Sequence, residues 1–146
     1  MPVLLQIAFG SIVLLVSAAL HLLVIARLVR HLRQHDHFAP TRPTRHQLTG
    51  ACILFLLLVA SHTAQIYIAA FGLWLIGALS GYEAPIYYAL VTYTTVGYGD
   101  LVLSPDHRIA GAMISFTGIL MFGMTTAFVV GLLTQILGEP TPRRRD

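Results

Sequence analysis

Two glycines alternate with larger side chains in one short segment, which reads Thr95, Val96, Gly97, Tyr98 and Gly99. Glycine adopts left-handed backbone conformations at little cost, whereas residues with a Cβ rarely adopt them. A backbone that alternates in hand can turn successive carbonyl oxygens toward one axis. Gly97 and Gly99 would permit this, while Val96 and Tyr98 would point outward and brace the segment. One chain supplies only one wall of a tube lined in this way.

The chain lacks the residue patterns typical of enzymes and of zinc sites. The sequence shows no nucleophile beside a base, no paired acids and no phosphate-binding motif, so we expect no enzyme and no bound cofactor. Cys52 is the one cysteine, which excludes an intrachain disulfide, and no Cys/His spacing indicates zinc. We expect no nucleic-acid partner.

The composition indicates a protein whose solvent is lipid. Of 146 residues, 56% are hydrophobic and 10% are charged, whereas soluble domains carry about 25% charged residues. An apolar run covers residues 3–26, and about 20 such residues suffice to cross a bilayer. A signal peptide is the alternative, because Ser17-Ala18-Ala19 loosely resembles a cleavage site. Arginines follow the run instead of preceding it, so we interpret residues 1–33 as a spanning helix and its flank.

The remaining segments predict two further spans with a shorter helix between them. After a polar loop at 34–47, we expect a spanning helix at 48–79, a short helix at 83–94, and a last spanning helix at 106–137, followed by a tail at 138–146. Glu83 and Pro85 favour a helix start. The short helix cannot cross the membrane, so residues 95–99, which follow it, are expected to lie within the membrane. Lipid cannot satisfy backbone N–H and C=O groups, so their carbonyls must face water or a partner.

The full motif Thr94-Thr95-Val96-Gly97-Tyr98-Gly99-Asp100 resembles the selectivity filter of potassium channels. The resemblance covers residues 48–137 as outer helix, pore helix, filter at 95–99 and inner helix. It implies an all-α membrane protein with three spanning helices and a re-entrant pore helix, assembled as a homotetramer. It also implies that K⁺ is the permeant ion. Its sites would be the carbonyls of Thr95, Val96, Gly97 and Tyr98, with the Thr95 hydroxyl.

Residues beside the filter have both a functional and a simpler interpretation. Asp100 predicts a ring of four carboxylates at the outer mouth, and a local turn cap is the alternative. Val91 stands where a bacterial relative has a glutamate bonded to the aspartate that matches Asp100, so that bond cannot form here. Tyr87 and Tyr88 match aromatic residues that brace the filter in the family, and they are otherwise anchors at the membrane interface.

The last spanning helix carries a stripe at three- and four-residue spacing, which comprises Ile119, Phe122, Thr126, Val130 and Thr134. By resemblance this stripe lines the cavity and the cytoplasmic gate. Gly118 and Gly123 match the hinge region of the family. Close packing against a neighbouring helix is the alternative for these glycines.

Charge distribution predicts the orientation of the chain. Five arginines oppose Asp36 between the first two spans, and three oppose two acids in the tail, whereas residues 80–108 hold three acids and Arg108. The positive-inside rule then places both basic segments in the cytoplasm and the N-terminus outside, in a cell inner (plasma) membrane. Arg27, Arg30 and Arg33 are expected to snorkel and bind anionic lipid, and we do not expect a voltage sensor.

Histidines are the remaining ionisable groups. His21 and His62 lie inside predicted spans, where such groups are functional candidates, although we favour neutral rings hydrogen-bonded between helices. His31, His35, His37 and His46 lie in or beside the cytoplasmic loop and could bind a metal or sense pH, while solvated loop histidines are commoner.

Two other functions are compatible with such helices. Potassium transporters are built from repeats of this hairpin, but those relatives join four units in one chain and usually keep one filter glycine. A non-conducting regulatory subunit would use the helices for assembly, and it would have no need of the intact filter.

Overall fold

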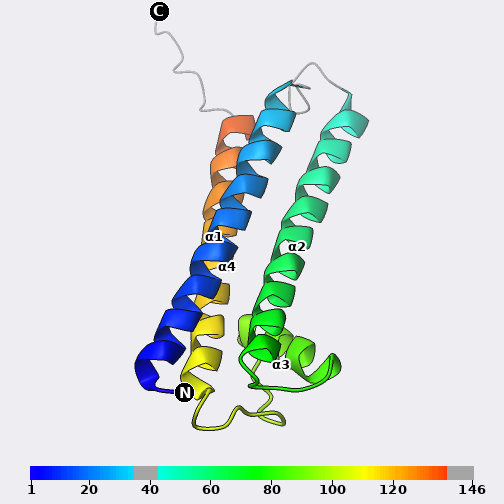
Figure 1. Ribbon diagram of the computed structural model, residues 1–146. Coiled ribbons are helices and arrows are strands. Elements are labelled where there is room, and N and C mark those ends of the chain that lie inside the picture. The colour runs from blue at the N-terminus through cyan, green and yellow to red at the C-terminus, as the bar shows by residue number, and fades with distance from the viewer. Residues whose placement is uncertain (35–42, 138–146) are drawn as a thin grey trace, which may run out of the picture.

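The structure is a computed structural model that describes residues 1–34 and 43–137 (Figure 1). This part of the chain contains four helices. They are α1 (Val3–Gln34), α2 (Thr44–Leu75), α3 (Glu83–Tyr93) and α4 (Arg108–Leu137). No strand occurs within these residues. The predicted all-helical membrane fold with three spans and a short helix is confirmed.

Three helices are long and apolar enough to cross a membrane, over Val3–Leu32, Arg45–Leu75 and Arg108–Thr134. Each residue of an α-helix rises about 1.5 Å, so each of these segments extends about 40 Å or more. The hydrocarbon core of a bilayer measures about 30 Å. The ends of all three helices therefore reach the headgroup region or the helices tilt.

The long helices run side by side, and α3 lies across one end of them (Figure 1). The start of α1, the start of α4 and the whole of α3 share that end. The end of α1, the start of α2 and the end of α4 share the opposite end. Arg27 and Arg30 of α1 and Arg45 of α2 therefore lie toward the same end of the molecule as the C-terminal end of α4.

The first helix is an integral part of this bundle. Helix α1 packs against both α2 and α4, which hardly touch each other, and among the described residues its backbone does not approach α3. At Gly10 an added Cβ would overlap Met113 of α4, so this contact requires glycine. Helix α1 therefore joins the other two spans from the side away from α3.

Helix α2 begins and ends one turn earlier than predicted, at Thr44 and Leu75 instead of residues 48 and 79. A polar first turn follows Pro43, whose φ of −57° suits a helix start. At the other end Gly77 has φ of +69°. Its N–H donates to the Trp74 carbonyl, and the N–H of Ala78 donates to the Leu73 carbonyl. This is a Schellman motif, which ends the helix although apolar residues follow.

The predicted ends of α1 and α4 also need correction. Helix α1 continues to Gln34, one residue beyond the unit drawn at 1–33, and α4 begins at Arg108 instead of residue 106. The Ser104 hydroxyl pairs with the His107 ring, and the Ile109 N–H donates to the Gln6 Oε1 at 3.0 Å. Gln6 is buried although it interrupts an apolar run. An α1 side chain therefore caps α4.

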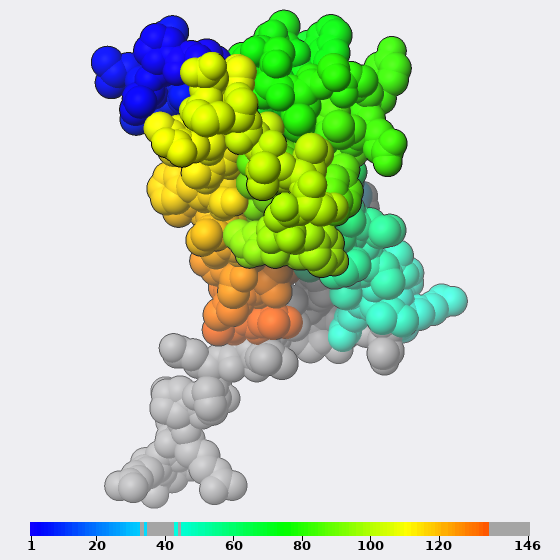
Figure 2. Space-filling model, turned by 90° about the horizontal axis from the view of Figure 1, so that it is seen from below, coloured from blue at the N-terminus to red at the C-terminus, as the bar shows by residue number. Residues whose placement is uncertain are grey.

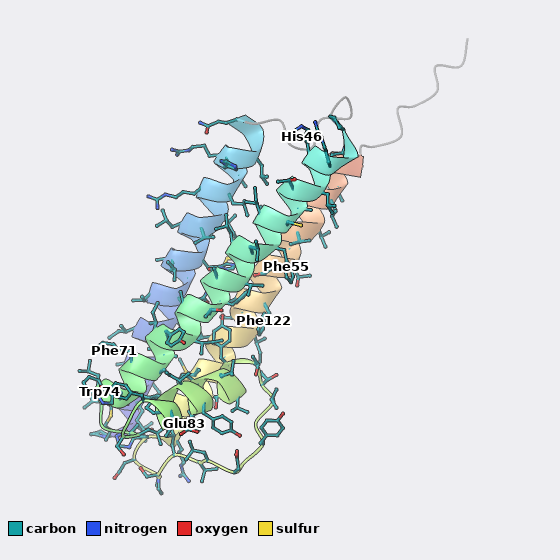
Figure 3. All side chains as sticks on the ribbon, turned by 90° about the vertical axis from the view of Figure 1, so that its right-hand side faces the viewer. His46, Phe55, Phe71, Trp74, Glu83 and Phe122 are labelled. Carbon is teal, nitrogen blue, oxygen red and sulfur yellow. The ribbon has the colours of Figure 1, made fainter. Side chains whose placement is uncertain are left out.

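The core lies where all four helices meet, and much apolar surface remains outside it. Leu73, Ala89, Tyr93 and Ile114 are fully buried in this core. In contrast, large side chains along α2 are exposed, among them Phe55, Phe71 and Trp74 (Figure 3). Surfaces of this kind require lipid or neighbouring subunits.

Candidate functional site

Residues 94–100 connect the end of α3 to the loop before α4, and we call this segment the strip. Gly97 and Gly99 have φ of +55° and +78°, which confirms the predicted left-handed backbone at both glycines. Val96 and Tyr98 are not among the residues with positive φ. The strip therefore alternates in hand along its length, as an array of carbonyls turned to one side requires.

Thr95 is a third left-handed residue, with φ of +62°. Its residue type gave no indication of this, because a β-branched side chain is rare in this region. Such a conformation costs about 1 to 3 kcal/mol and persists where the surroundings impose it. The Thr95 N–H donates to the Thr92 carbonyl at 3.0 Å, which helps to hold this turn.

The strip uses its N–H groups to attach itself to α3. Besides the bond at Thr95, the Gly97 N–H donates to the Val91 carbonyl at 3.2 Å. Within the described residues no hydrogen bond is accepted by the carbonyl oxygens of Thr95, Val96, Gly97 or Tyr98. The donors of the strip are thus partly satisfied inside the chain, whereas four successive acceptors are free.

The strip is also exposed. Residues 95–100 are all exposed, with Tyr98 at 74% and Val96 at 53% of their full accessibility. In Figure 2 the yellow-green segment lies on the viewer's face of the molecule, beside α3 and α4. One chain thus leaves both the carbonyl oxygens of the strip and the side chains of Val96 and Tyr98 uncovered.

Asp100 follows the last glycine and is held by α3. The Tyr87 hydroxyl donates to the Asp100 Oδ2 at 2.6 Å. This hydrogen bond lowers the pKa of the Asp100 carboxyl and raises the pKa of the Tyr87 hydroxyl. Val91 is buried and cannot bond Asp100, so Tyr87 supplies the link between α3 and Asp100. Tyr87 therefore contacts Asp100 directly, and its role in bracing the filter stays a prediction.

The two hinge candidates have different surroundings. A Cβ at Gly118 would overlap the carbonyl oxygen of Tyr93, whereas no atom lies within 4 Å of a Cβ at Gly123. Gly118 thus allows α4 to touch the backbone at the end of α3, which supports the close-packing interpretation. A hinge at Gly123 stays a prediction, since α4 is continuous through both glycines.

The predicted stripe of α4 is exposed, so it is available to line a cavity. Ile119 and Val130 are 57% and 53% exposed. Phe122 differs, because its ring centroid lies 4.7 Å from that of His62 and 5.5 Å from that of Tyr93. Thr126 and Thr134 donate their hydroxyls to carbonyls within α4.

Both histidines inside the spans are hydrogen-bonded between helices, as we predicted. His21 of α1 bonds Ser61 and Thr125, and His62 of α2 bonds Tyr93 and Thr125. The identity of these partners was not predictable from the sequence. Among the loop histidines, His35 and His37 lie outside the described residues. In the described part of the chain no group of three metal-ligating residues occurs.

The arginines that we predicted to be cytoplasmic are described in part. Arg27 and Arg30 are exposed near the end of α1, a position that suits snorkelling toward lipid headgroups. The side chain of Arg33 lies outside the described part, as does the whole of Arg42.

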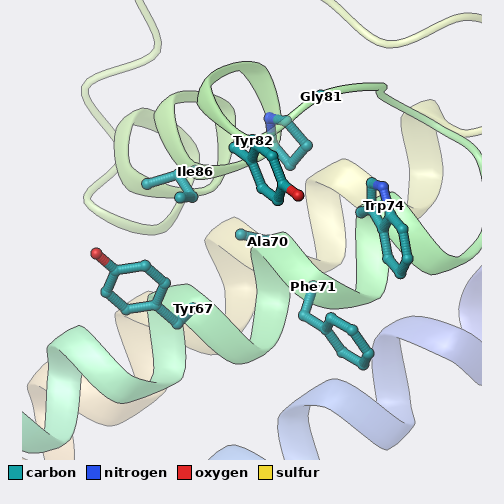
Figure 4. A pocket seen from close by; sticks show the side chains of 8 residues that line it. Tyr67, Ala70, Phe71, Trp74, Gly81, Tyr82 and Ile86 are labelled. Carbon is teal, nitrogen blue, oxygen red and sulfur yellow. The ribbon is translucent and has the colours of Figure 1, made fainter.

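A surface pocket of about 430 Å³ lies between α2 and the start of α3 (Figure 4). Phe71 and Trp74 line it from α2, and Tyr82 and Ile86 line it from the other side. Its walls carry no charged group and are separate from the strip.

Comparison with known proteins agrees with this geometry. The ion channel family matches residues 52–135, which is more than half of the chain and includes α3 and the strip. The potassium voltage-gated channel protein shk-1 of Caenorhabditis elegans is 44% identical over 48 residues. That stretch covers 32% of this chain and only 9% of the relative. No solved structure matches. The helices, the strip and the family match together show that this membrane protein belongs to the ion channel family.

Proposed function

We propose that four copies of this chain form a channel that conducts K⁺ selectively along a central axis. The observation that carries the proposal is the row of free carbonyl oxygens from Thr95 to Tyr98, on a backbone that is left-handed at every second residue. In potassium channels, rings of such carbonyls replace the hydration shell of K⁺. Four chains are needed to surround the ion.

Two electrostatic features support cation conduction. Helix α3 ends at Tyr93 just before the strip, so its carbonyl end, with about half a negative charge, points toward the ion path. Asp100 contributes a carboxylate from each chain at the outer mouth. This carboxylate is charged at neutral pH, and its hydrogen bond with Tyr87 lowers the pKa further. The cation is thus stabilised without a carboxylate buried in the membrane.

The exposed surfaces support assembly in a bilayer. Val96 and Tyr98 are covered when copies meet around an axis, and the exposed stripe of α4 then lines the central cavity. The apolar outer surfaces of α1 and α2 then face lipid. We place the strip and the N-terminus outside the cell inner membrane and the arginine-rich end in the cytoplasm, where Arg27 and Arg30 meet anionic headgroups.

A flux assay on the full chain tests this proposal. Purified protein in liposomes is given a K⁺ gradient or an equal Na⁺ gradient, and the two fluxes are compared in vesicles with and without protein. Native mass spectrometry of the same sample counts the subunits. We expect K⁺ flux well above Na⁺ flux from a tetramer. Equal fluxes, no flux, or a different subunit count would overturn the proposal.

A further inference from the structure

Six polar side chains from all four helices meet behind the end of α3. They are His21 of α1, Ser61, His62 and Gln65 of α2, Tyr93 of α3 and Thr125 of α4. His21, Gln65 and Tyr93 are completely buried. A buried polar group without a partner is costly, so the arrangement of donors and acceptors decides whether this cluster stabilises the fold.

The direction of each hydrogen bond follows from the chemistry of the groups. The Gln65 Nε2 can only donate, so the His21 Nδ1 at 3.2 Å accepts. The proton of a neutral His21 then lies on Nε2 and is donated to the Thr125 hydroxyl at 3.0 Å. This assignment of the tautomer rests on the partners of the ring.

The remaining hydrogen bonds close a cycle. The Tyr93 hydroxyl donates to the Gln65 Oε1 at 2.7 Å, so it accepts from the His62 Nδ1 at 2.9 Å. The His62 Nε2 then accepts the proton of Thr125 at 2.9 Å. Each of the five groups donates once and accepts once around this hydrogen-bond cycle. The Ser61 hydroxyl adds contacts to His21 and Gln65.

The cycle is complete only when both histidines are neutral. A second proton on His62 would point a donor at Thr125, and one on His21 would point a donor at the Gln65 amide. The ring centroids of His21 and His62 are 5.1 Å apart, so two charges would repel. No carboxylate or arginine occurs in residues 1–26, 46–82, 84–99 or 109–137, so no residue in these stretches of the packed helices neutralises a charge there.

Tyr93 connects this cycle to the strip. Its hydroxyl belongs to the cycle, its carbonyl lies against Gly118, and its ring packs edge-on against Phe122. The strip begins at the next residue and is bonded to the Val91 and Thr92 carbonyls of the same helical turn. A displacement of Tyr93 therefore displaces the backbone on which the strip rests.

We propose that His21, His62, Gln65 and Thr125 are positioning residues for the strip, which act through Tyr93. The inference rests on the proposed function, since the quantity that they control is ion selectivity. It also assigns a role to α1, because His21 brings that helix into the cycle. An α1 without this side chain would still pack, but the strip would be held less firmly.

Thr125 offers a sharp test, because it bridges the two histidines. Thr125→Val keeps the shape and removes the hydroxyl, while Thr125→Ser keeps the hydroxyl. In liposomes containing the full chain, we expect Thr125→Val to lower the ratio of K⁺ to Na⁺ flux by about tenfold, because buried partners are left unpaired. Thr125→Ser should retain the ratio. Tyr93→Phe, which opens the cycle elsewhere, should lower it as Thr125→Val does.

His21→Ala has a matched control on its own helix. Ser17 lies one turn earlier, is fully buried, and its hydroxyl has no hydrogen-bond partner among the described residues. We expect His21→Ala to lower the flux ratio and Ser17→Ala to leave it unchanged. A general loss of folding reduces both fluxes together and does not change their ratio, so the ratio separates positioning from stability.

The outcomes distinguish the two proposals. A wild-type protein without K⁺ preference overturns the proposed function. A selective wild type whose ratio is the same in Thr125→Val, Thr125→Ser and Tyr93→Phe overturns the positioning role alone. Should one variant fail to assemble, the other two still decide the question.

Discussion

The strip and the hydrogen-bond cycle lie at the same end of α3, yet they satisfy their polar groups in opposite ways. Within the cycle every donor meets an acceptor inside one chain. Along the strip, four successive carbonyls have no partner in the described part of the chain. The cycle is complete in a single copy, whereas the free carbonyls of the strip would be completed by other copies and an ion only in the proposed channel.

This contrast separates residues that determine folding from residues that determine conduction. Changes confined to the strip should alter ion flux with little effect on the stability of the chain. Changes near the buried helix contacts should alter stability, and they should reach the flux only through Tyr93. Substitutions in each region can break or sharpen this division.

The largest effect is expected for Gly97→Ala and Gly99→Ala. An added methyl group penalises the left-handed backbone by about 1 kcal/mol, which is enough to turn the carbonyls away from the axis. Selective K⁺ flux in liposomes should be abolished. Gly81→Ala is the control. Gly81 lies outside the strip and has φ of +76°, so an alanine there is subject to a similar backbone penalty. Continued preference for K⁺ over Na⁺ in the strip variants would show that these glycines are not required.

Gly118→Ala should affect both regions. Its methyl group overlaps the Tyr93 carbonyl, and overpacking of this kind costs about 1 to 3 kcal/mol. We expect a lower thermal midpoint in detergent together with reduced K⁺ selectivity. Gly123→Ala is the matched control, with open space at its Cβ, and should keep both properties. Equal behaviour of the two variants would refute the importance of the contact.

The charge of Asp100 at the end of the strip predicts that ion flux depends on pH. The Tyr87 hydroxyl lowers the pKa of the Asp100 carboxyl, so the charge persists to a lower pH than usual and is lost as the pH falls through that pKa. In Tyr87→Phe this hydrogen bond is lost, so the pKa of the Asp100 carboxyl should rise. The acid-induced loss of K⁺ flux at low ionic strength should then shift to higher pH. Tyr82→Phe, at an exposed tyrosine outside this contact, should leave the curve unchanged. An unshifted curve in Tyr87→Phe would break the link between the two groups.

Gln6→Met should have the smallest effect. It leaves the Ile109 N–H without its acceptor, and loss of a helix cap costs about 1 kcal/mol. We expect a lower melting temperature with an unchanged ratio of K⁺ to Na⁺ flux, while Gln6→Glu retains an acceptor and most of the stability. A change in the ratio would contradict the separation of folding from conduction.

Local features of the chain were predictable from sequence. The three spans, the short helix and the left-handed Gly97 and Gly99 follow from apolar run lengths and residue type alone. The positions of the helix ends were less predictable. Gly77 ends α2 inside an apolar stretch, so hydropathy placed the end one turn too far.

Contacts between distant residues were not predictable. The partners of the hydrogen-bond cycle are separated by 28 to 104 residues, so neither periodicity nor spacing brings them together. Polar residues in a span indicated only that some partner must exist. Gly118 was predicted as a hinge or as a packing site; the position of the Tyr93 carbonyl supports packing, and the hinge role stays a prediction.

In the proposed channel, the backbone contact at Gly118 also restricts which motions of α4 could open the pore. The N-terminal half of α4 touches α3 there, so an outward swing of the whole helix would pull the end of α3 with it and disturb ion coordination. An opening motion that preserves selectivity would therefore bend α4 farther along, toward its C-terminal half. We expect the first half of α4 to stay with the strip while the second half moves.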